Sequence, residues 1–215
     1  MIYIIGQGPS GLMLAYMLNK KYPSLPVTLV DKTRKPWHCN YGIWKRKIKN
    51  TWLYQLFGET MYKYSFNSIQ VNFQGNHSKK IPIEYGFLRN KLVKKELEKG
   101  IKFKYLNWNG KQKQGFYVDC RGRRSITKDM NSTVGIQQFV GIIIKLKGKV
   151  PNHLNKLTLM DYTIDFKKDP PTFAYIYPIG NNKLFMEETC LIHHQPLKYS
   201  LFVNRLKLRM KKLRL

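Results

Sequence analysis

Acidic residues are scarce in this sequence. Among 215 residues, 12 Asp and Glu stand against 39 Lys and Arg, so the formal net charge is +27. A surplus of this size attracts polyanions, either nucleic acid or an anionic lipid surface. A lysine-rich surface that is only solvated is an equally good interpretation. No zinc-finger, KH or RNP-type motif is present, so we expect no specific nucleic-acid partner.

Cysteines are also few, and long apolar runs are missing. Cys39, Cys120 and Cys190 are too scattered to form a disulfide framework or a metal site, so we expect no metal and a reducing compartment. No apolar run approaches the length that spans a bilayer. No basic leader precedes the first predicted strand, so we expect no signal peptide. The hydrophobic residues, 43% of the chain, suffice for the core of one domain, or of one and a half.

The first 31 residues carry the clearest pattern. Met1–Ile5 predicts a buried strand, and residues 12–20 place apolar side chains at helical spacing. Residues 27–30 predict a second strand, which ends at Asp31, twenty residues after Gly11. The turn between the first strand and the helix contains three glycines. This order of strand, glycine turn, helix, strand and acid is the fingerprint of a dinucleotide-binding fold.

Each part of the fingerprint has a physical role. Gly6 allows a tight turn, Gly8 lets a pyrophosphate approach the backbone, and Gly11 lets the helix pack closely on the sheet. The N–H groups and dipole of the helix N-terminus face the phosphates. Asp31 accepts hydrogen bonds from a ribose 2′-OH, which disfavours a 2′-phosphate. A chance glycine-rich turn is the weaker alternative. We therefore expect the cofactor to be bound by Gly6, Gly8, Pro9, Ser10, Gly11, Asp31 and Lys32.

The middle of the chain predicts further α/β elements. We expect a short helix over 51–57, strands over 68–73 and 80–83, an amphipathic helix over 87–99, and strands over 101–106 and 116–118. Gly75 and Asn76 supply the turn of the first strand pair. Asp119 and Gly122 follow a strand and suggest a second cofactor contact, although an ordinary turn explains them at least as often.

From residue 134 the pattern becomes that of an antiparallel sheet. We expect strands over 134–146, 157–166, 172–177 and 183–188, with a hairpin joining the last two. Glu187 and Glu188 end the last strand, where neighbours point to opposite faces. One of them can face an apolar pocket, where its pKa would rise and it could deliver a proton. A solvated strand end is the plain alternative. Residues 199–215 predict a basic amphipathic helix, suited to a membrane surface or, preferably, to packing on the sheet.

These motifs resemble, in order, those of the FAD-dependent lycopene cyclase family of plants, cyanobacteria and bacteria. Residues 2–18 are similar to its FAD fingerprint, 37–44 to its NYGxW segment, 85–97 to its Arg-then-Leu helix, and 118–122 to its VDATG segment. Residues 134–141 and 159–166 resemble its QQxxG and MD strands. The most specific match is 174–191, AYIYPIGNNKLFMEETCL, which resembles the family's proline hairpin and FLEET motif.

The resemblance implies a redox-neutral reaction with reduced FAD as the cofactor. A carotenoid ψ-end is protonated, the chain closes on the carbocation, and loss of a proton leaves an ionone ring. The resemblance assigns acid/base catalysis to Glu187 and Glu188, and it adds FAD contacts at Arg89, Asp119 and Gly122. A lycopene-like substrate implies a peripheral position at the cytoplasmic face of a membrane, or at a plastid-type membrane, with affinity for its anionic surface.

We therefore predict an α/β fold with a Rossmann-like FAD-binding sheet and an adjoining antiparallel β-sheet for the substrate. The expected domains are an FAD-binding region over 1–128, of which 65–85 contributes strands to the second sheet, a substrate-region sheet over 129–192, and a basic helix over 193–215. Family chains run further, so we expect a truncated chain or one half of a split enzyme with a complementing C-terminal half. An inactive or regulatory FAD-binding homologue, a monooxygenase-like flavoenzyme and a basic binding protein remain alternatives.

Overall fold

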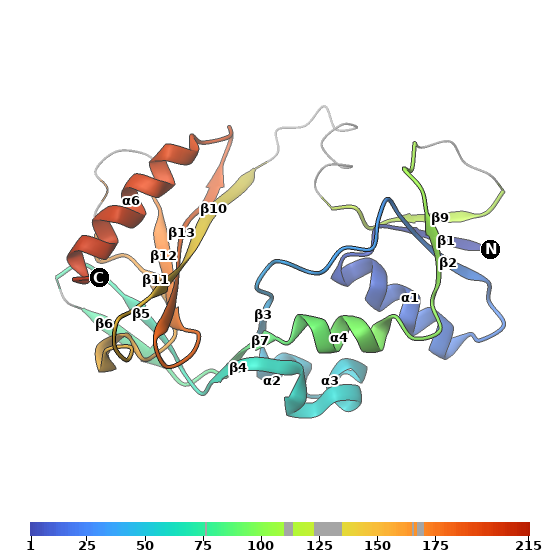
Figure 1. The fold of residues 1–215 in the computed structure, drawn as a ribbon, viewed down its shortest axis with the longest axis horizontal. Coiled ribbons are helices and arrows are strands. Elements are labelled where there is room, and N and C mark those ends of the chain that lie inside the picture. Colours follow the sequence, from blue (N-terminus) through green and yellow to red (C-terminus); the bar gives the residue numbers. More distant parts are fainter. Residues whose placement is uncertain (76, 110–113, 123–134, 165, 167–169) are drawn as a thin grey trace. The chain divides into compact units, whose positions relative to one another are not determined.

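A computed structural model describes residues 1–75, 77–109, 114–122, 135–164, 166 and 170–215. The chain forms two compact units, coloured by sequence in Figure 1. Unit 1 contains Met1–Gly42, Asn50–Lys63 and the described residues of Phe87–Ser132. Unit 2 contains Ile43–Lys49, Tyr64–Gly86 and the described residues of Thr133–Leu215. The predicted domain boundary between 128 and 129 lies outside the described residues.

Unit 1 is built on a parallel sheet with the strand order β8-β2-β1-β9. Ile4 and Leu29 are fully buried in it, and α1 packs against it through Leu12, Ala15 and Tyr16. The strand order reverses at β1, and such a switch point is where open α/β sheets bind ligands. The elements of unit 1 are β1 (Ile2–Ile5), α1 (Pro9–Lys21), β2 (Val27–Asp31), α3 (Trp52–Phe57), the 3₁₀ helix η1 (Gly58–Met61), α4 (Asn90–Leu97), β8 (Lys102–Tyr105) and β9 (Phe116–Asp119).

Unit 2 is built on a six-stranded sheet with the order β10-β13-β12-β11-β5-β6. Its pairs are antiparallel except β5 with β11, which run parallel. Helix α6 lies along one face (Figure 1). The elements are α2 (Lys45–Ile48), β5 (Ile69–Asn72), β6 (Ser78–Ile81), β10 (Ile136–Lys145), the 3₁₀ helix η2 (Asn152–Leu154), β11 (Thr158–Asp161), β12 (Phe173–Pro178), β13 (Lys183–His193) and α6 (Tyr199–Lys212).

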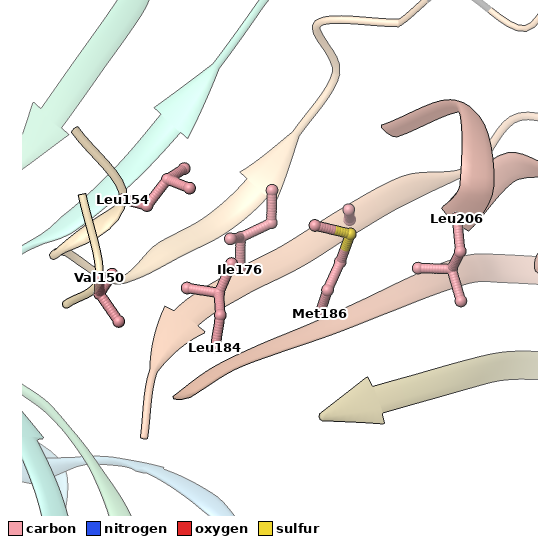
Figure 2. Packing of buried hydrophobic residues seen from close by; sticks show 7 residues of the cluster. Val150, Leu154, Ile176, Leu184, Met186 and Leu206 are labelled. Carbon is pink, nitrogen blue, oxygen red and sulfur yellow. The ribbon is translucent and has the colours of Figure 1, made fainter. Parts of the chain in front are cut away.

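The apolar core of unit 2 lies between this sheet and α6. Every second residue of β12 and β13 points toward the helix, as the two-residue period of a strand requires. The cluster consists of Val150, Leu154, Ala174, Ile176, Leu184, Met186 and Leu206, and Figure 2 shows the aliphatic side chains from β12, β13 and α6 converging in it.

The predicted α/β fold with a Rossmann-like sheet and an antiparallel sheet is thus confirmed.

A third, small sheet has the order β3-β7-β4, with β3 (Gly42–Trp44), β4 (Tyr62–Phe66) and β7 (Tyr85–Leu88). The chain passes from one unit to the other within each of these strands. The helix predicted over 87–99 was therefore placed too early. Phe87 and Leu88 belong to β7, and the Leu88 N–H donates to the carbonyl of Tyr41. Helix α4 begins only at Asn90, because the backbone before it is already engaged in pairing.

Further elements differ from the sequence prediction, among them β6, which spans Ser78–Ile81 and not 80–83, and two other strands of the second sheet. The strand predicted over 157–166 ends at Asp161, because its carboxylate accepts hydrogen bonds from the N–H and hydroxyl of Thr163 and so favours a turn. The strand predicted to end at Glu188 continues to His193. Parts of other predictions, namely residues 76, 134 and 165, lie outside the described residues.

The C-terminal helix packs on the sheet, the preferred of the two predictions for it. Phe202 and Leu206 are buried, as their spacing predicts. Arg205 and Arg209 are buried on the same helix, although the charged residues of an amphipathic helix usually face away from the core. The sheet face that receives them contains acidic partners, described below.

Candidate functional site

The glycine turn after β1 combines tight packing with open space. Gly6 has φ of +108°, and a Cβ there would lie 2.7 Å from the carbonyl oxygen of Cys120. A Cβ at Gly11 would lie 2.0 Å from the carbonyl oxygen of Gly6. A Cβ at Gly8 would meet no atom of the described residues within 4 Å. Gly6 and Gly11 therefore serve packing, whereas the space beside Gly8 admits the close approach of a ligand.

The N-terminus of α1 follows directly. Gly8 is its N-cap and Pro9 occupies the first turn, where a missing N–H is harmless. No side chain in the described ranges caps this helix end, and Ser10 is exposed. The first-turn N–H groups and the positive end of the helix dipole thus point at the space beside Gly8, which suits a phosphate.

Asp31 is held in place at the end of β2. Its two carboxylate oxygens accept the backbone N–H of Gln7 at 2.9 Å and that of Lys32 at 2.6 Å. Trp37 donates its indole N–H to the carbonyl of Gln7 at 3.0 Å. A carboxylate has about four acceptor positions, so Asp31 keeps the capacity to accept from ribose hydroxyls.

A basic cavity of about 940 Å³ lies in unit 1 beside Trp37. Lys94, which lines it, reaches the side-chain oxygen of Gln7 at 3.5 Å and so connects the cavity with the glycine turn. Glu98 binds both Lys94 and Arg34. Burial opposes ionisation of Glu98, but the hydrogen bonds and charges of these two cations outweigh it and lower its pKa. The charged lining residues are Arg34, Lys35, Lys63, Arg89, Lys91, Lys94, Lys95 and Glu98.

The positive excess of this lining makes the cavity suited to an anionic ligand. Arg89, predicted as a cofactor contact, is among the lining residues and is exposed. Its guanidinium donates to the carbonyl of Tyr62 at 3.2 Å, and its backbone N–H donates to the carbonyl of Met61. These bonds fix the direction of the side chain at the cavity.

Asp119 and Gly122 lie at the same sheet edge as the glycine turn. Asp119 is the register partner of Ile5, the residue before Gly6, in the parallel pair of β9 and β1. Its carboxylate is held by Arg121 through the backbone N–H and the guanidinium. Gly122 has φ of +76° with open space at its Cβ position. The structure therefore brings together the cofactor residues predicted from β1, β2 and β9.

In unit 2, Glu187 lies on the aromatic face of the sheet. Its register partners are Tyr175 on β12 and Gly141 on β10, and a Cβ at Gly141 would lie 3.4 Å from its Oε2. Burial raises the pKa of the Glu187 carboxyl, and a hydrogen bond from the Thr189 hydroxyl at 3.1 Å offsets only part of this. Burial likewise raises the pKa of Tyr85, to about 12, with Tyr175 and Glu187 adding to the effect.

Aromatic rings on this face contact one another in pairs. Side chains two residues apart in a strand point to the same face, so every second residue of β12 and β13 lies on the face of Glu187. Ring centroids lie 5.2 Å apart for Phe173 with Tyr175 and 4.9 Å apart for Tyr177 with Phe185. A partly buried carboxyl surrounded by rings can hold and deliver a proton.

Glu188 points to the opposite face and is fully buried. Arg209 of α6 donates to both of its oxygens and, at 2.8 Å, to Asp161 of β11. The Thr172 hydroxyl donates to Glu188 as well, and Arg205 donates to that hydroxyl at 2.7 Å. The two predicted catalytic neighbours thus occupy different environments. Glu188 is part of a buried ion pair, whereas Glu187 forms no ion pair with any residue that the structure describes.

Several of these residues were missed by sequence reasoning. Gln7 lies between two recognised glycines, but its link to Asp31 needs the folded turn. Glu98 follows Lys94 at helical spacing, a signal that could have been read as an i, i+4 pair. Arg209 gave no signal, because the apolar residues at helical spacing in the C-terminal segment are Phe202, Leu206, Met210 and Leu213. Among the described residues, no cluster of three His, Cys, Asp or Glu side chains is placed to hold a metal ion.

A parallel sheet with a glycine turn at its switch point defines a dinucleotide-binding α/β protein. Solved structures that share this fold with the chain include those of flavin-dependent enzymes. A peptidyl tryptophan dihydroxylase matches with a TM-score of 0.64 and 14% identity, over 98% of this chain and 50% of that protein. The flavin-dependent halogenase CmlS matches with a TM-score of 0.59 and 14% identity, over 87% of this chain and 41% of that protein.

The chain belongs to the lycopene cyclase family, whose model, described as "Lycopene cyclase protein", matches residues 2–111 and 111–215. Curated relatives include the capsanthin/capsorubin synthase of Citrus sinensis, 26% identical over 98% of this chain and 47% of its own length. The chloroplastic lycopene beta cyclase of Solanum lycopersicum is 24% identical over 91% of this chain and 44% of its own length. The lycopene beta cyclase of Synechococcus elongatus is 24% identical over 94% of this chain and 54% of its own length. The chain spans about half the length of these relatives.

Proposed function

We propose that the chain is a lycopene-cyclase-like flavoprotein that takes part in the redox-neutral cyclisation of carotenoid ψ-ends to ionone rings. One observation carries the proposal. In a chain of this family, the structure holds a carboxyl of raised pKa, that of Glu187, on an aromatic sheet face. That combination suits proton transfer to an apolar polyene, because a raised pKa favours the protonated carboxyl, which is the form that can donate a proton.

The proposed cofactor is FAD, held by unit 1. The space beside Gly8 receives the pyrophosphate, and the N-terminus of α1 supplies N–H donors and a positive dipole. Asp31 accepts from the ribose, and Arg89, Asp119 and Gly122 complete the proposed contacts. The lining of the basic cavity fits the negative charge of the cofactor. When bound in reduced form, FAD would supply a negative charge that stabilises a carbocation without net electron transfer.

In the proposed step, Glu187 gives its proton to the terminal double bond of the ψ-end. The electron pair of a neighbouring double bond then closes the ring on the resulting cation. The ionised Glu187 recovers a proton from a ring carbon, so the substrate and product are isomers and the acid is restored. Aromatic rings such as those of Tyr175 and Phe185 attract cations through their π faces and favour the charged intermediate.

Glu188 has a different part in this proposal. Its carboxylate is held by Arg209 on the face that packs against α6, so it keeps β13 in register with the helix and β11. We propose that it supports the position of Glu187 and transfers no proton itself.

The proposed substrate dissolves in lipid, so we further propose a peripheral position at a membrane. That membrane is the cytoplasmic face of a bacterial-type membrane or a plastid-type membrane, and its anionic surface would attract a chain of net charge +27. Among the described residues, no helix has the length and apolarity needed to cross a bilayer. A second polypeptide that supplies the remaining half of the family's length is a proposed partner.

The experiment is a complementation assay in bacteria that accumulate lycopene. The chain is expressed alone and together with the C-terminal half of the Synechococcus elongatus relative, and pigments are separated by chromatography. We expect ionone-ring products with wild-type chain and none with Glu187→Gln, while flavin absorbance of the purified protein is unchanged by that substitution. Lycopene left unaltered in both arms by soluble, flavin-loaded protein would contradict the proposal.

A second candidate function is oxygen-dependent flavin chemistry, since the solved structures of similar fold include a dihydroxylase and a halogenase. Steady oxidation of NADH or NADPH by the purified flavoprotein, with an oxygenated product, would favour it. Protein that is folded but free of flavin would instead favour an inactive or regulatory homologue.

A further inference from the structure

Helix α1 carries more apolar surface than the sheet covers. Residues 12–18 read LMLAYML without a polar interruption. Leu12, Ala15 and Tyr16 are buried against unit 1, whereas Met17 remains 44% exposed. A helix that is apolar on all sides requires an apolar neighbour on each of them. One apolar face of α1 is therefore left uncovered by the parallel sheet of unit 1.

The exposed face of α1 forms one wall of a groove, and α3 forms the other. The groove has a volume of about 710 Å³. Tyr16 stacks on Trp52 of α3 with a centroid distance of 5.4 Å, which fixes the spacing of the two helices. Leu56 is 39% exposed and Tyr22 is 47% exposed. The apolar lining comprises Leu14, Met17, Leu18, Tyr22, Trp52 and Leu56.

The rim of the groove is cationic. Lys20 and Lys21 line it, and none of the described residues that line it is acidic. The Lys20 ammonium lies 5.7 Å from the ring centroid of Tyr16, and that of Lys21 lies 5.4 Å from the ring centroid of Tyr22. Apolar and aromatic side chains with lysines at their edge are the composition of a surface that enters the headgroup region of a bilayer.

We propose that the groove between α1 and α3 is the surface by which unit 1 docks on an anionic phospholipid bilayer. This inference rests on the proposed membrane position and names the residues that provide it. Met17, Leu56 and Trp52 enter the acyl boundary, while Lys20 and Lys21 bind phosphate headgroups. A second copy of this chain is a poorer occupant, because it would bring a second pair of lysines to the rim of a molecule whose net charge is already +27.

The test measures binding of the purified chain to vesicles of phosphatidylcholine with and without phosphatidylglycerol. We expect sedimentation with the anionic vesicles, weakened by salt, and little with the neutral ones. The double variant Met17→Glu, Leu56→Glu should bind about tenfold more weakly, because it places two charges in the acyl boundary. Lipids brominated in the acyl chain should quench tryptophan fluorescence in the wild type, and Trp52→Phe should remove most of that quenching.

The matched control is Leu191→Glu, Ile192→Glu, which makes the same charge change at side chains of β13 that are 57% and 67% exposed. We expect it to keep most of the vesicle binding. Equal loss in both double variants would show that net charge alone governs binding and would overturn the proposal. If the wild type is a dimer and Met17→Glu, Leu56→Glu makes it a monomer, the groove would instead be the interface with a second copy of the chain. Flavin absorbance, measured on the same samples, reports on the cofactor site separately from vesicle binding.

Discussion

Arg209 of α6 donates hydrogen bonds to both carboxylate oxygens of Glu188 on β13, and both side chains are withdrawn from solvent. The arginine also reaches Asp161 at 2.8 Å, so one cation joins two strands to the helix. Burying these charges is costly, and their hydrogen bonds compensate for that cost only while every member is present. The pair is therefore a sensitive point in the fold of unit 2.

Replacing one member of the pair should destabilise unit 2 strongly. Glu188→Met leaves Arg209 with a buried charge, and we expect it to lower the free energy of unfolding by about 3 kcal/mol. The double variant Glu188→Met, Arg209→Met also takes the Arg209 guanidinium from Asp161. It should still lose less than the sum of the single variants, because the Glu188–Arg209 pair is lost only once and neither partner of that pair keeps an uncompensated charge. Lys207→Met, on the exposed side of α6, is the control and should change stability by less than about 0.5 kcal/mol. Urea titration measures all four, and strictly additive losses would contradict the coupling.

Glu187 should make stability depend on pH. Its pKa in the folded chain is raised by burial, so the folded state binds its proton more tightly than the unfolded state does. The stability that this group contributes is complete below the ordinary carboxyl pKa and is lost as pH rises through the raised value. Glu187→Gln removes this dependence. The free energy of unfolding of the variant should therefore rise relative to that of the wild type as pH increases between the ordinary and the raised pKa. Denaturant titrations at several pH values test this, and a constant difference between the two proteins would refute it.

The two glycines of the turn should respond differently to alanine. Gly11→Ala forces a Cβ to 2.0 Å from the Gly6 carbonyl oxygen, so we expect unit 1 to lose stability and its melting temperature to fall. The methyl group of Gly8→Ala meets no atom within 4 Å in the part of the chain that the structure describes, so the melting temperature should stay nearly unchanged. Because its methyl group would occupy the proposed phosphate position, flavin binding should still be lost. Flavin absorbance together with thermal melts separates the outcomes, and retention of flavin by Gly8→Ala would disprove the assignment.

Arg89 should contribute to cofactor affinity through charge. Arg89→Gln removes one charge-assisted hydrogen bond at the basic cavity, and we expect FAD affinity to fall about tenfold, or about 1.4 kcal/mol. The loss should shrink at high salt, where charges are screened. Lys79→Gln on β6 makes the same change of net charge on an exposed strand of unit 2 and should leave FAD affinity intact. Titration of the apoprotein with FAD, followed by fluorescence, gives both values.

Local patterns of the sequence predicted much of the fold. The strand, glycine turn and acid of the first 31 residues fold as expected because their conformations depend on residues close in sequence. The same holds for the hairpin of β12 and β13, whose turn contains Gly180 with φ of +133°. Errors arose where distant partners compete with local preference. Phe87 and Leu88 have helical spacing with the residues after them, yet they pair in β7.

The candidate site divides in the same way. The sequence by itself determined that a dinucleotide fingerprint is present, that two acids are adjacent on a strand and that the chain is strongly basic, since each is a matter of residue type and spacing. Only the tertiary structure decided that Glu188 faces Arg209 while Glu187 faces aromatic rings, and that Glu98 binds both Arg34 and Lys94. The environment of a charge depends on side chains contributed by distant parts of the chain, and no local pattern records which of them will meet.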